Sequence, residues 1–229
     1  MKLNFIVTRL QAAILEEQDK IDNLYPSLTD DTKFWCMVDL VNSSNYRLLK
    51  GPRLGYVRGE TFFNLVKKVI YKNNQVRLVK EIGDAVLLAA DSIRPLLESC
   101  ILMNKIALNI KNTQSTETYP FEIRIGFGFG IVKKLIRQYE DFLGSSIDQL
   151  ARIMSVRSET SNMYIQEQAY SYNKSILEEY SSFLHISSPI KLLPKDTKNM
   201  IEDIIYRELV IDWEKFLEFN EYFTNWREL

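Results

Sequence analysis

Apolar residues in this chain recur at two spacings, and each spacing predicts a different kind of element. Residues 3–24 carry a stripe at helical intervals, followed by Pro26, which predicts an amphipathic N-terminal helix. That stripe consists of Ile6, Leu10, Ala13, Ile14, Glu17 and Ile21. Residues 34–41, Phe-Trp-Cys-Met-Val-Asp-Leu-Val, are instead a nearly continuous apolar run of strand length. The pattern therefore predicts a helix before a first buried strand.

The central part of the chain alternates predicted strands and helices. A polar loop at residues 42–45 precedes a helix at residues 60–71, whose apolar stripe includes Phe62 and Val66. Two strand-like runs, residues 76–82 and 85–90, flank Gly83-Asp84, and this pattern predicts a tight β-hairpin. A helix over residues 93–110 and a polar loop at residues 112–118 follow.

The second half of the chain predicts a shorter series of elements. Residues 121–132 contain three glycines at alternate positions, which predicts a long strand closely approached by another backbone. A helix at residues 145–154, a strand at residues 163–166 and a helical, aromatic-rich tail from Asp196 follow. We expect three parts: an N-terminal helix (1–30), a main domain (31–195) and a helical C-terminal extension packed on it (196–229).

This element order predicts an α+β fold. Strand, helix, hairpin, helix, strand, helix and strand follow one another, as in ferredoxin-like or palm-type mixed sheets with helices mainly on one face. In such a sheet Asp39 ends a central strand and Asp84 lies in the adjacent hairpin. We therefore expect the two carboxylates to converge at one edge of the sheet.

Composition narrows the classes of partner. The 229 residues include 29 basic and 30 acidic side chains, a net charge of −1, which argues against a general nucleic-acid or anionic-membrane surface. No apolar run reaches the roughly 18 residues that a membrane span needs, and no signal peptide is evident. We expect a soluble, cytoplasmic protein that recognises any polyanion locally.

Cysteine and histidine offer little chemistry. Cys36 and Cys100 fall in a predicted strand and a predicted helix, which favours buried free thiols over a disulfide. His185, the single histidine of the sequence, is expected to have a packed or hydrogen-bonded role. Catalysis would therefore depend on carboxylates and cations.

Two aspartates in apolar strand-like runs are the main candidates for chemistry. An ionised carboxylate in an apolar setting needs a cation, hydrogen bonds or a raised pKa. Asp39 and Asp84 have no cation beside them on their own strand face, which points to a shared Mg²⁺ site. The alternative is that both lie at strand ends and meet solvent or cap a turn.

Four blocks of sequence, in order, resemble the class III nucleotide cyclases, the family of adenylyl and guanylyl cyclase catalytic domains, over about residues 33–170. They are Val38-Asp-Leu-Val41, Lys80-Glu-Ile-Gly-Asp-Ala85, Ile123-Arg-Ile-Gly126 and Gly144-Ser-Ser-Ile-Asp-Gln-Leu-Ala-Arg152. The resemblance implies the class III cyclase fold and a homodimer with active sites at its interface. A nucleoside triphosphate would be the substrate, with two Mg²⁺ or Mn²⁺ ions in each site.

The resemblance also implies roles for particular residues. Asp39, Leu40 and Asp84 would form the metal site, and the other subunit would supply Arg152 to the developing negative charge. Asp148 stands where most relatives carry a ribose-binding Asn. Alternatively, Arg152 is a solvated helix residue paired with Asp148.

Further positions are candidates for nucleotide binding. Lys80 and Asp141 fall where adenylyl cyclases place their adenine-reading Lys and Asp, although both also fit exposed surface positions. Ser43 and Ser44, in a loop that departs from the family's usual Gly-Phe-Thr/Ser, are candidates for cradling phosphates. Arg137 and Lys195 are weaker candidates for the same role.

The chain looks like a nearly bare catalytic domain, most similar to the pyrimidine cyclases of bacterial antiphage signalling. These make cyclic UMP or cyclic CMP for a separate effector protein. Tyr46, soon after the metal strand, is a candidate for shortening the base pocket. The leading hypothesis is a cyclase acting on UTP or CTP. The alternatives are a stand-alone adenylyl cyclase and a non-catalytic nucleotide-binding homologue.

Overall fold

A computed structural model describes residues 29–114, 116–136, 140–155, 162–193 and 203–219. The first half comprises β1 (Thr29–Leu40), α2 (Ser43–Lys50), α3 (Pro52–Tyr71), β2 (Arg77–Ile82), β3 (Ala85–Ala90) and α4 (Ile93–Asn112). The second half comprises β4 (Ile123–Ile136), β5 (Glu140–Leu143), α5 (Ser145–Ile153), β6 (Met163–Gln166), α6 (Glu167–Tyr172), α7 (Lys174–Glu178), β7 (Leu184–Ile186), β8 (Ile190–Leu192), β9 (Ile204–Ile211) and α8 (Trp213–Phe219). The expected N-terminal helix lies outside these residues.

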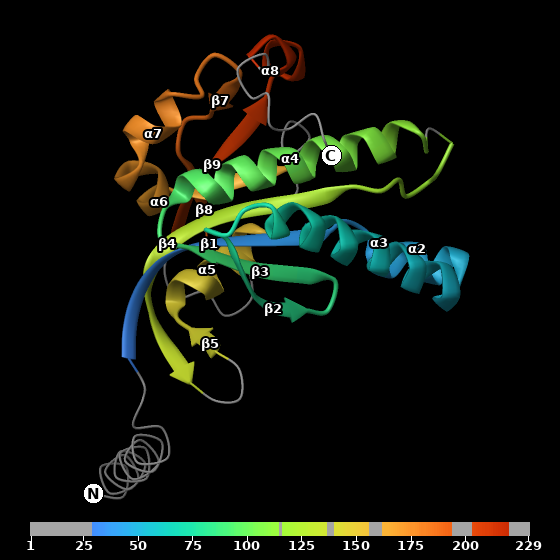
Figure 1. Ribbon diagram of the computed structural model, residues 1–229, viewed down its shortest axis with the longest axis horizontal. Coiled ribbons are helices and arrows are strands. Elements are labelled where there is room, and N and C mark those ends of the chain that lie inside the picture. Colours follow the sequence, from blue (N-terminus) through green and yellow to red (C-terminus); the bar gives the residue numbers. More distant parts are fainter. Residues whose placement is uncertain (1–28, 115, 137–139, 156–161, 194–202, 220–229) are drawn as a thin grey trace, which may run out of the picture.

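Nine strands of the described chain form one mixed sheet. Its main order is β2-β3-β1-β4-β6-β9-β7, with β5 paired to β4 and β8 paired to β9. Only β4 and β6 pair in parallel among these strands, whereas β1 is antiparallel to both β3 and β4. Figure 1 shows α3 and α4 lying across one side of the sheet, with α5 on the other. The α+β architecture expected from the sequence is confirmed.

The two faces of β1 explain its nearly continuous apolar sequence. Phe34, Cys36, Val38 and Leu40 belong to a core shared with α3 and α4, while Trp35 and Met37 belong to a second core shared with α5. A strand buried on both faces has no polar positions to alternate with its apolar ones. Asp39 follows Met37 on the α5 face, because side chains alternate along a strand.

The glycines of β4 are explained by close packing, although not by the backbone approach expected. A Cβ on Gly126 would lie 2.7 Å from the Met154 sulfur, and one on Gly130 would lie 2.7 Å from the Ser146 Cβ. At these two positions the approaching atoms are side chains of α5 and the residue after it, so these glycines let the helix lie directly on the strand. A Cβ on Gly128 would instead lie 2.8 Å from the side-chain oxygen of Gln166 in β6.

Three local predictions were wrong. Residues 43–45 begin the helix α2 instead of continuing a polar loop, and α3 starts at Pro52 rather than at residue 60. Proline suits the first turn of a helix because its missing N–H has no partner there. Residues 204–211, expected to be helical, form the strand β9. Because β9 pairs with β6, this part of the expected C-terminal extension belongs to the sheet itself.

The prediction for the two cysteines is confirmed, whereas that for the histidine is not. Cys36 and Cys100 are free and buried, as expected, with their sulfur atoms 3.2 Å apart. The His185 side chain is 56% exposed and lies 4.0 Å from the Asp212 carboxylate, so the packed role was wrong and only a polar contact remains.

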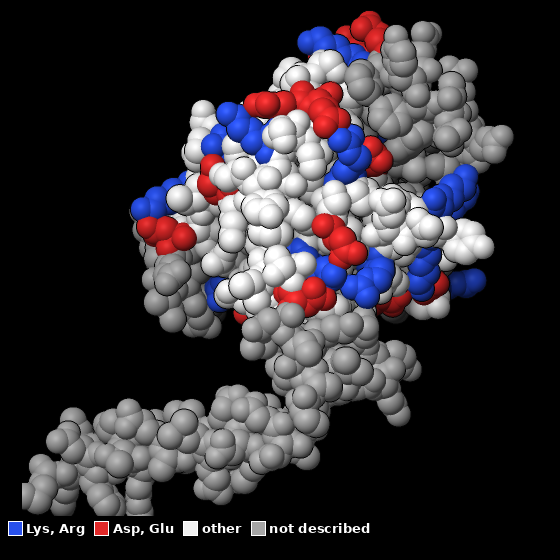
Figure 2. Space-filling model, turned by 60° about the vertical axis from the view of Figure 1, so that its left-hand side comes forward, with Lys and Arg blue, Asp and Glu red and all other residues white. Residues whose placement is uncertain are grey.

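Over the face shown in Figure 2, acidic and basic side chains are interspersed. No described helix combines the length and apolar character needed to cross a membrane.

Candidate active site

The two aspartates singled out in the sequence lie side by side at the end of β1. Asp39 is opposite Ala85 in the register of β1 and β3, and Asp84 occupies the preceding turn. Gly83 has φ +64°, the left-handed conformation that this two-residue turn requires. The backbone N–H of Leu40 donates to the carbonyl of Asp84 over 3.0 Å. The hairpin thus holds one carboxylate against the strand that carries the other.

The charge of this pair is not balanced by protein groups alone. Burial raises the pKa of Asp39 to about 6, the Asp84 carboxylate adds to that rise, and the Arg124 guanidinium opposes it. A carboxylate whose ionisation is this unfavourable is stabilised by a bound divalent cation. The donor set therefore fits Mg²⁺ or Mn²⁺, which prefer oxygen ligands.

The small number of protein ligands also agrees with a metal ion that is bound jointly by the protein and the substrate phosphates. No group of three or more His, Cys, Asp or Glu side chains suited to a metal occurs among the described residues. Mg²⁺ commonly binds through one or two carboxylates, with substrate phosphates and water completing its coordination. The Leu40 side chain has no atom that can bind a metal, so this residue would offer only its main-chain carbonyl oxygen.

The start of α2 forms a second side of the site. Asn42 has φ +56° and precedes the helix, and the buried Ser43 hydroxyl donates a hydrogen bond to the Asp84 carboxylate. Ser44 is exposed in the same first turn. The free backbone N–H groups of a helix N-terminus attract anions such as phosphate. Ser43 thus connects the carboxylate pair to a terminus suited to a phosphate group.

Arg124 is a site residue that sequence reasoning quoted within a motif but left without a role. It lies directly opposite Asp39 in the pairing of β1 and β4, on the same face. Its guanidinium donates to the Met154 carbonyl, just after α5. No pattern along the chain identifies it, because its place opposite Asp39 depends on the register in which β4 pairs with β1.

Arg58 is a second residue that sequence reasoning missed. This buried side chain donates to the carbonyl of Tyr119 at 2.7 Å, to that of Pro120 at 2.8 Å and to that of Val41 at 3.1 Å. The Tyr46 ring lies over the same guanidinium, 4.5 Å from its central carbon to the ring centroid. Arg58 therefore holds the chain between β1 and α2 against the segment before β4. Tyr46 packs on this arginine.

A β-bulge determines which face of β2 carries Lys80. The pairing of β2 with β3 shifts between Leu78 and Lys80, and Lys80 then lies opposite Leu87 of the α5-side core. The bulge thereby places Lys80 on the face of the sheet that carries Asp39. The strand β5, which contains Asp141, lies beside β2, where the Arg77 guanidinium is 5.9 Å from the Phe142 ring. The two strands expected to read the base are therefore neighbours.

Asp148 and Arg152 lie on a different side of α5 from its apolar residues. Ile147, Leu150 and Ile153 are buried toward the sheet, whereas Asp148 is exposed and Arg152 is partly buried. Position 152 is one turn after position 148, so the two residues share the outer side of the helix. The side chain of Asp141, and both Arg137 and Lys195, lie outside the described residues.

Comparison with known proteins identifies the fold. The adenylyl cyclase CyaB from P. aeruginosa superposes with a TM-score of 0.61, at 15% identity over 80% of this chain and 96% of that chain. The catalytic core of a rhodopsin-guanylyl cyclase with converted specificity, in complex with ATPαS, gives 0.62 at 15% identity over 81% of this chain and 98% of that chain. A non-canonical dimeric guanylyl cyclase domain from the aquatic fungus Blastocladiella emersonii gives 0.60 at 15% identity over 80% and 97%. No protein-family profile and no curated protein matches the sequence. The chain has the fold of class III cyclase catalytic domains.

Proposed function

We propose that this protein is a nucleotide cyclase, which converts a nucleoside triphosphate into a 3′,5′-cyclic monophosphate and diphosphate. The observation that carries the proposal is the Asp39–Asp84 pair, at the end of the central strand of a class III cyclase fold. Here the carboxylates meet a helix N-terminus and a guanidinium. Carboxylates, backbone amides and a guanidinium are the groups that bind a metal-complexed triphosphate.

The proposed reaction is an internal displacement at the α-phosphorus. The ribose 3′-oxygen bonds to that phosphorus, the bond to the bridging oxygen of the β-phosphate breaks, and diphosphate leaves as the hydroxyl proton is lost. Divalent metal, when bound, lowers the pKa of the 3′-hydroxyl and neutralises phosphate charge. Asp39 and Asp84 would hold the metal, with the carbonyl of Leu40 as a further oxygen ligand. The N-terminus of α2 and Arg124 would orient the phosphates.

A second subunit would complete each site. Asp148 and Arg152 share the outer side of α5, where they can reach a neighbouring molecule. We propose a head-to-tail homodimer in which Arg152 of one copy stabilises the charge that develops in the other, and Asp148 contacts the ribose. The guanidinium would act electrostatically, as arginines do in other phosphoryl transfers.

The base is proposed to be a pyrimidine, with UTP ahead of CTP. Similarity to the antiphage pyrimidine cyclases supports this choice, and it implies that a separate effector reads the cyclic product in antiviral defence. A second candidate, ATP, is favoured by the bulge that turns Lys80 toward the site face beside β5. Tyr46→Ala tests whether Tyr46 is the cause of a pyrimidine preference, because an unchanged base preference would exclude Tyr46 from sizing the pocket.

The direct test is product identification. The protein would be incubated separately with ATP, GTP, CTP and UTP in the presence of Mn²⁺, and products identified by mass. Asp39→Asn should reduce turnover at least about 100-fold, as loss of a group that stabilises the transition state does. Asp91→Asn, which changes an exposed carboxylate outside the site, is the matched control. No cyclic product with any nucleotide would contradict the proposal.

A further inference from the structure

The helices α2 and α3 expose an apolar surface that the proposed chemistry does not use. Five large side chains are open to solvent on the last turns of α2 and the first turns of α3. They are Leu48, Leu49, Leu54, Tyr56 and Val57, exposed by 85%, 56%, 47%, 69% and 53%. Figure 1 shows this helix pair at one extreme of the molecule. A group of exposed apolar side chains of this size marks an interaction surface, which we call the α2–α3 surface.

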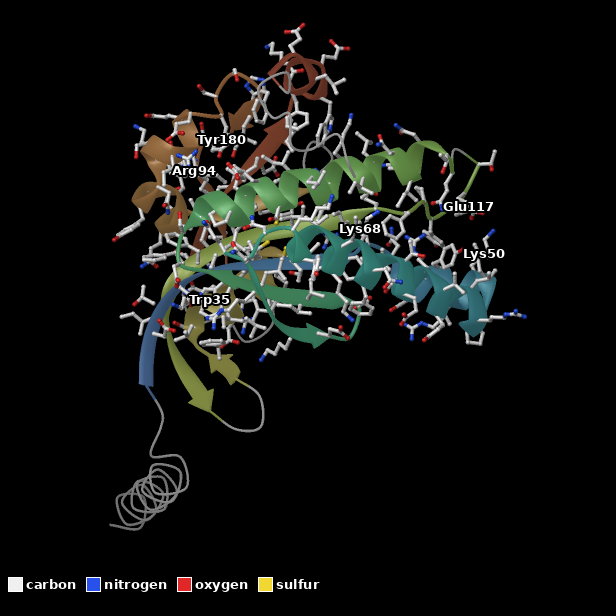
Figure 3. The ribbon with its side chains drawn as sticks, viewed as in Figure 1. Trp35, Lys50, Lys68, Arg94, Glu117 and Tyr180 are labelled. Atoms are coloured by element: carbon white, nitrogen blue, oxygen red, sulfur yellow. The ribbon has the colours of Figure 1, made fainter. Side chains whose placement is uncertain are left out.

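The charge of the α2–α3 surface restricts what can cover it. Arg47, Lys50 and Arg53 are exposed there, and residues 43–59 contain no acidic side chain. Figure 3 shows Lys50 and Glu117 at the far end of the helix pair, and their charged groups lie 3.1 Å apart. This ion pair leaves the positive charges of Arg47 and Arg53 for a partner to balance. Two copies of the surface would repel one another if they packed face to face. The complementary partner is apolar and acidic.

The α2–α3 surface is mechanically joined to the candidate site. A Cβ on Gly55 would lie 2.8 Å from the Arg47 Cγ, so α2 packs tightly on the start of α3. The first residue of α2, Ser43, donates its hydroxyl hydrogen bond to Asp84. Anything that binds the α2–α3 surface therefore also holds the helix whose N-terminus meets the two carboxylates.

Residues 3–24 of this chain have the complementary chemistry. Their apolar stripe contains Leu10 and Ile14, and it also includes Glu17, a carboxylate that needs a cation on whatever surface the stripe covers. The second half of the segment, residues 15–24, has four acidic residues and one basic residue. An amphipathic segment of this kind matches a surface of leucines bordered by arginines.

The direction of β1 decides which copy of the segment can reach the surface. Figure 1 shows the start of β1 and the α2–α3 pair at opposite ends of the molecule. The 12 residues of β1 span about 40 Å. A helix over residues 3–24 would be about 33 Å long, too short to run back past β1 and then cover the surface. In a head-to-tail dimer whose two copies run in opposite directions along β1, the start of the partner's β1 would instead lie at this end.

We propose that the α2–α3 surface of each copy binds residues 3–24 of the other copy. The inference rests on the proposed function, because the head-to-tail dimer supplies the geometry. Exchange of the two N-terminal segments would bury ten large apolar side chains across the dimer, and would pair Glu17 of each copy with Arg47 or Arg53 of the partner. It would also make the position of α2, and hence of Ser43, depend on the presence of the second copy.

Cysteine crosslinking between full-length chains tests this arrangement. One preparation carries Leu10→Cys and the other Leu48→Cys, with distinguishable tags, and both retain the buried native cysteines. After subunit exchange and mild oxidation, a mixed covalent dimer should form about 1,000-fold faster than between unassociated chains, because docking raises the local thiol concentration from micromolar to millimolar. Leu10→Cys with Leu217→Cys is the matched control, since Leu217 is also 55% exposed but lies on α8. A second pair, Ile14→Cys with Val57→Cys, guards against one misfolded variant.

Each outcome decides between occupants. A mixed covalent dimer in the test pairs but not in the control supports exchange between copies. A crosslink seen only when both changes are in one chain would assign the surface to the chain's own segment and overturn the proposal. No crosslink either between chains or within one chain would assign the α2–α3 surface to a different partner and would also overturn the proposal. Cyclase assays on the same samples separate the two proposals. If cyclic product forms without the mixed dimer, only the docking proposal is contradicted. If the mixed dimer forms without cyclic product, only the proposed function is contradicted.

Discussion

Replacing Asp39 with asparagine should remove activity and yet stabilise the metal-free protein. Asp39 is partly buried next to Asp84, so its ionised form is disfavoured in the folded state and its pKa rises to about 6. Asparagine has nearly the same shape and carries no charge. The substitution therefore removes a charge that is unfavourable at the site, first because it is buried and second because Asp84 repels it.

The size of the effect follows from the pKa. A rise from 3.8 to about 6 is roughly two pH units, and at about 1.4 kcal/mol per unit it corresponds to about 3 kcal/mol. The carboxylate retains some contact with water, which screens part of this energy, so about 2 kcal/mol is expected. Because the folded-state pKa is raised, the stability contributed by protonated Asp39 is present below pH 3.8 and is lost as pH rises through about 6.

Denaturant unfolding in the presence of a chelator measures this directly. The free energy of unfolding of Asp39→Asn, minus that of the unmodified protein, should increase by about 2 kcal/mol between pH 4 and pH 7. Asp91→Asn is the control, because Lys33 lowers the pKa of Asp91. Its contribution to stability therefore changes mainly below pH 3.8, and the corresponding difference should stay nearly constant between pH 4 and pH 7. Saturating Mn²⁺ should then stabilise the unmodified protein by about 2.7 kcal/mol at 100 times its dissociation constant, and leave Asp39→Asn unchanged.

Two results would refute this reasoning. A difference in unfolding free energy between Asp39→Asn and the unmodified protein that does not vary with pH would show that neither burial nor Asp84 raises the pKa of Asp39 in the folded state. Equal stabilisation of both proteins by Mn²⁺ would place the metal elsewhere, even if the pH dependence were as expected.

Three further substitutions test the surroundings of the carboxylate pair. Ser43→Ala should lower turnover about tenfold and stability by about 1 kcal/mol, because the Asp84 carboxylate loses a hydrogen-bond donor; unchanged kinetics would remove Ser43 from the site. Arg58→Met should reduce stability by about 3 kcal/mol, measured by urea unfolding, since three backbone carbonyls lose their donor. If Arg58→Met lost less stability than Arg58→Lys, the proposed role of Arg58 in holding these carbonyls would be contradicted, because lysine retains the charge and a hydrogen-bond donor. Gly126→Ala should cost about 1–3 kcal/mol in thermal unfolding, since its Cβ would meet the buried Met154 sulfur at 2.7 Å; a neutral result would show that the Met154 side chain shifts to make room.

Local pattern was sufficient where one element dictates its own conformation. The sequence predicts three features where the structure has them: the apolar run of β1, the Gly83-Asp84 turn and the short strand β6. Each is indicated by an apolar run or by turn residues within a few positions of the chain. The proximity of Asp39 and Asp84, which are 45 residues apart, was predicted instead from the order of the elements, which puts the hairpin beside the first strand. A two-residue hairpin that pairs with its neighbouring strand leaves little freedom for where its tip lies.

Elements whose identity depends on distant partners were predicted poorly. Residues 204–211 alternate weakly within an aromatic-rich tail, and they are a strand because β6 offers them a pairing edge. Residues 43–45 have the composition of a turn, yet they begin a helix whose entry is held by Arg58 through Val41. Neither partner is near in sequence, so propensity alone favoured the wrong state.

By itself, then, the sequence determined the α+β class, the principal strands and the two carboxylates that converge. Only the tertiary structure decided how the rest of the site faces them. Strand register placed Arg124 opposite Asp39, and a single bulge turned Lys80 onto the same face of the sheet. These features depend on which residues of separate strands come to lie opposite one another. Since the side-chain period of a strand is two residues, a shift of one position reverses the face, and no local pattern encodes that choice.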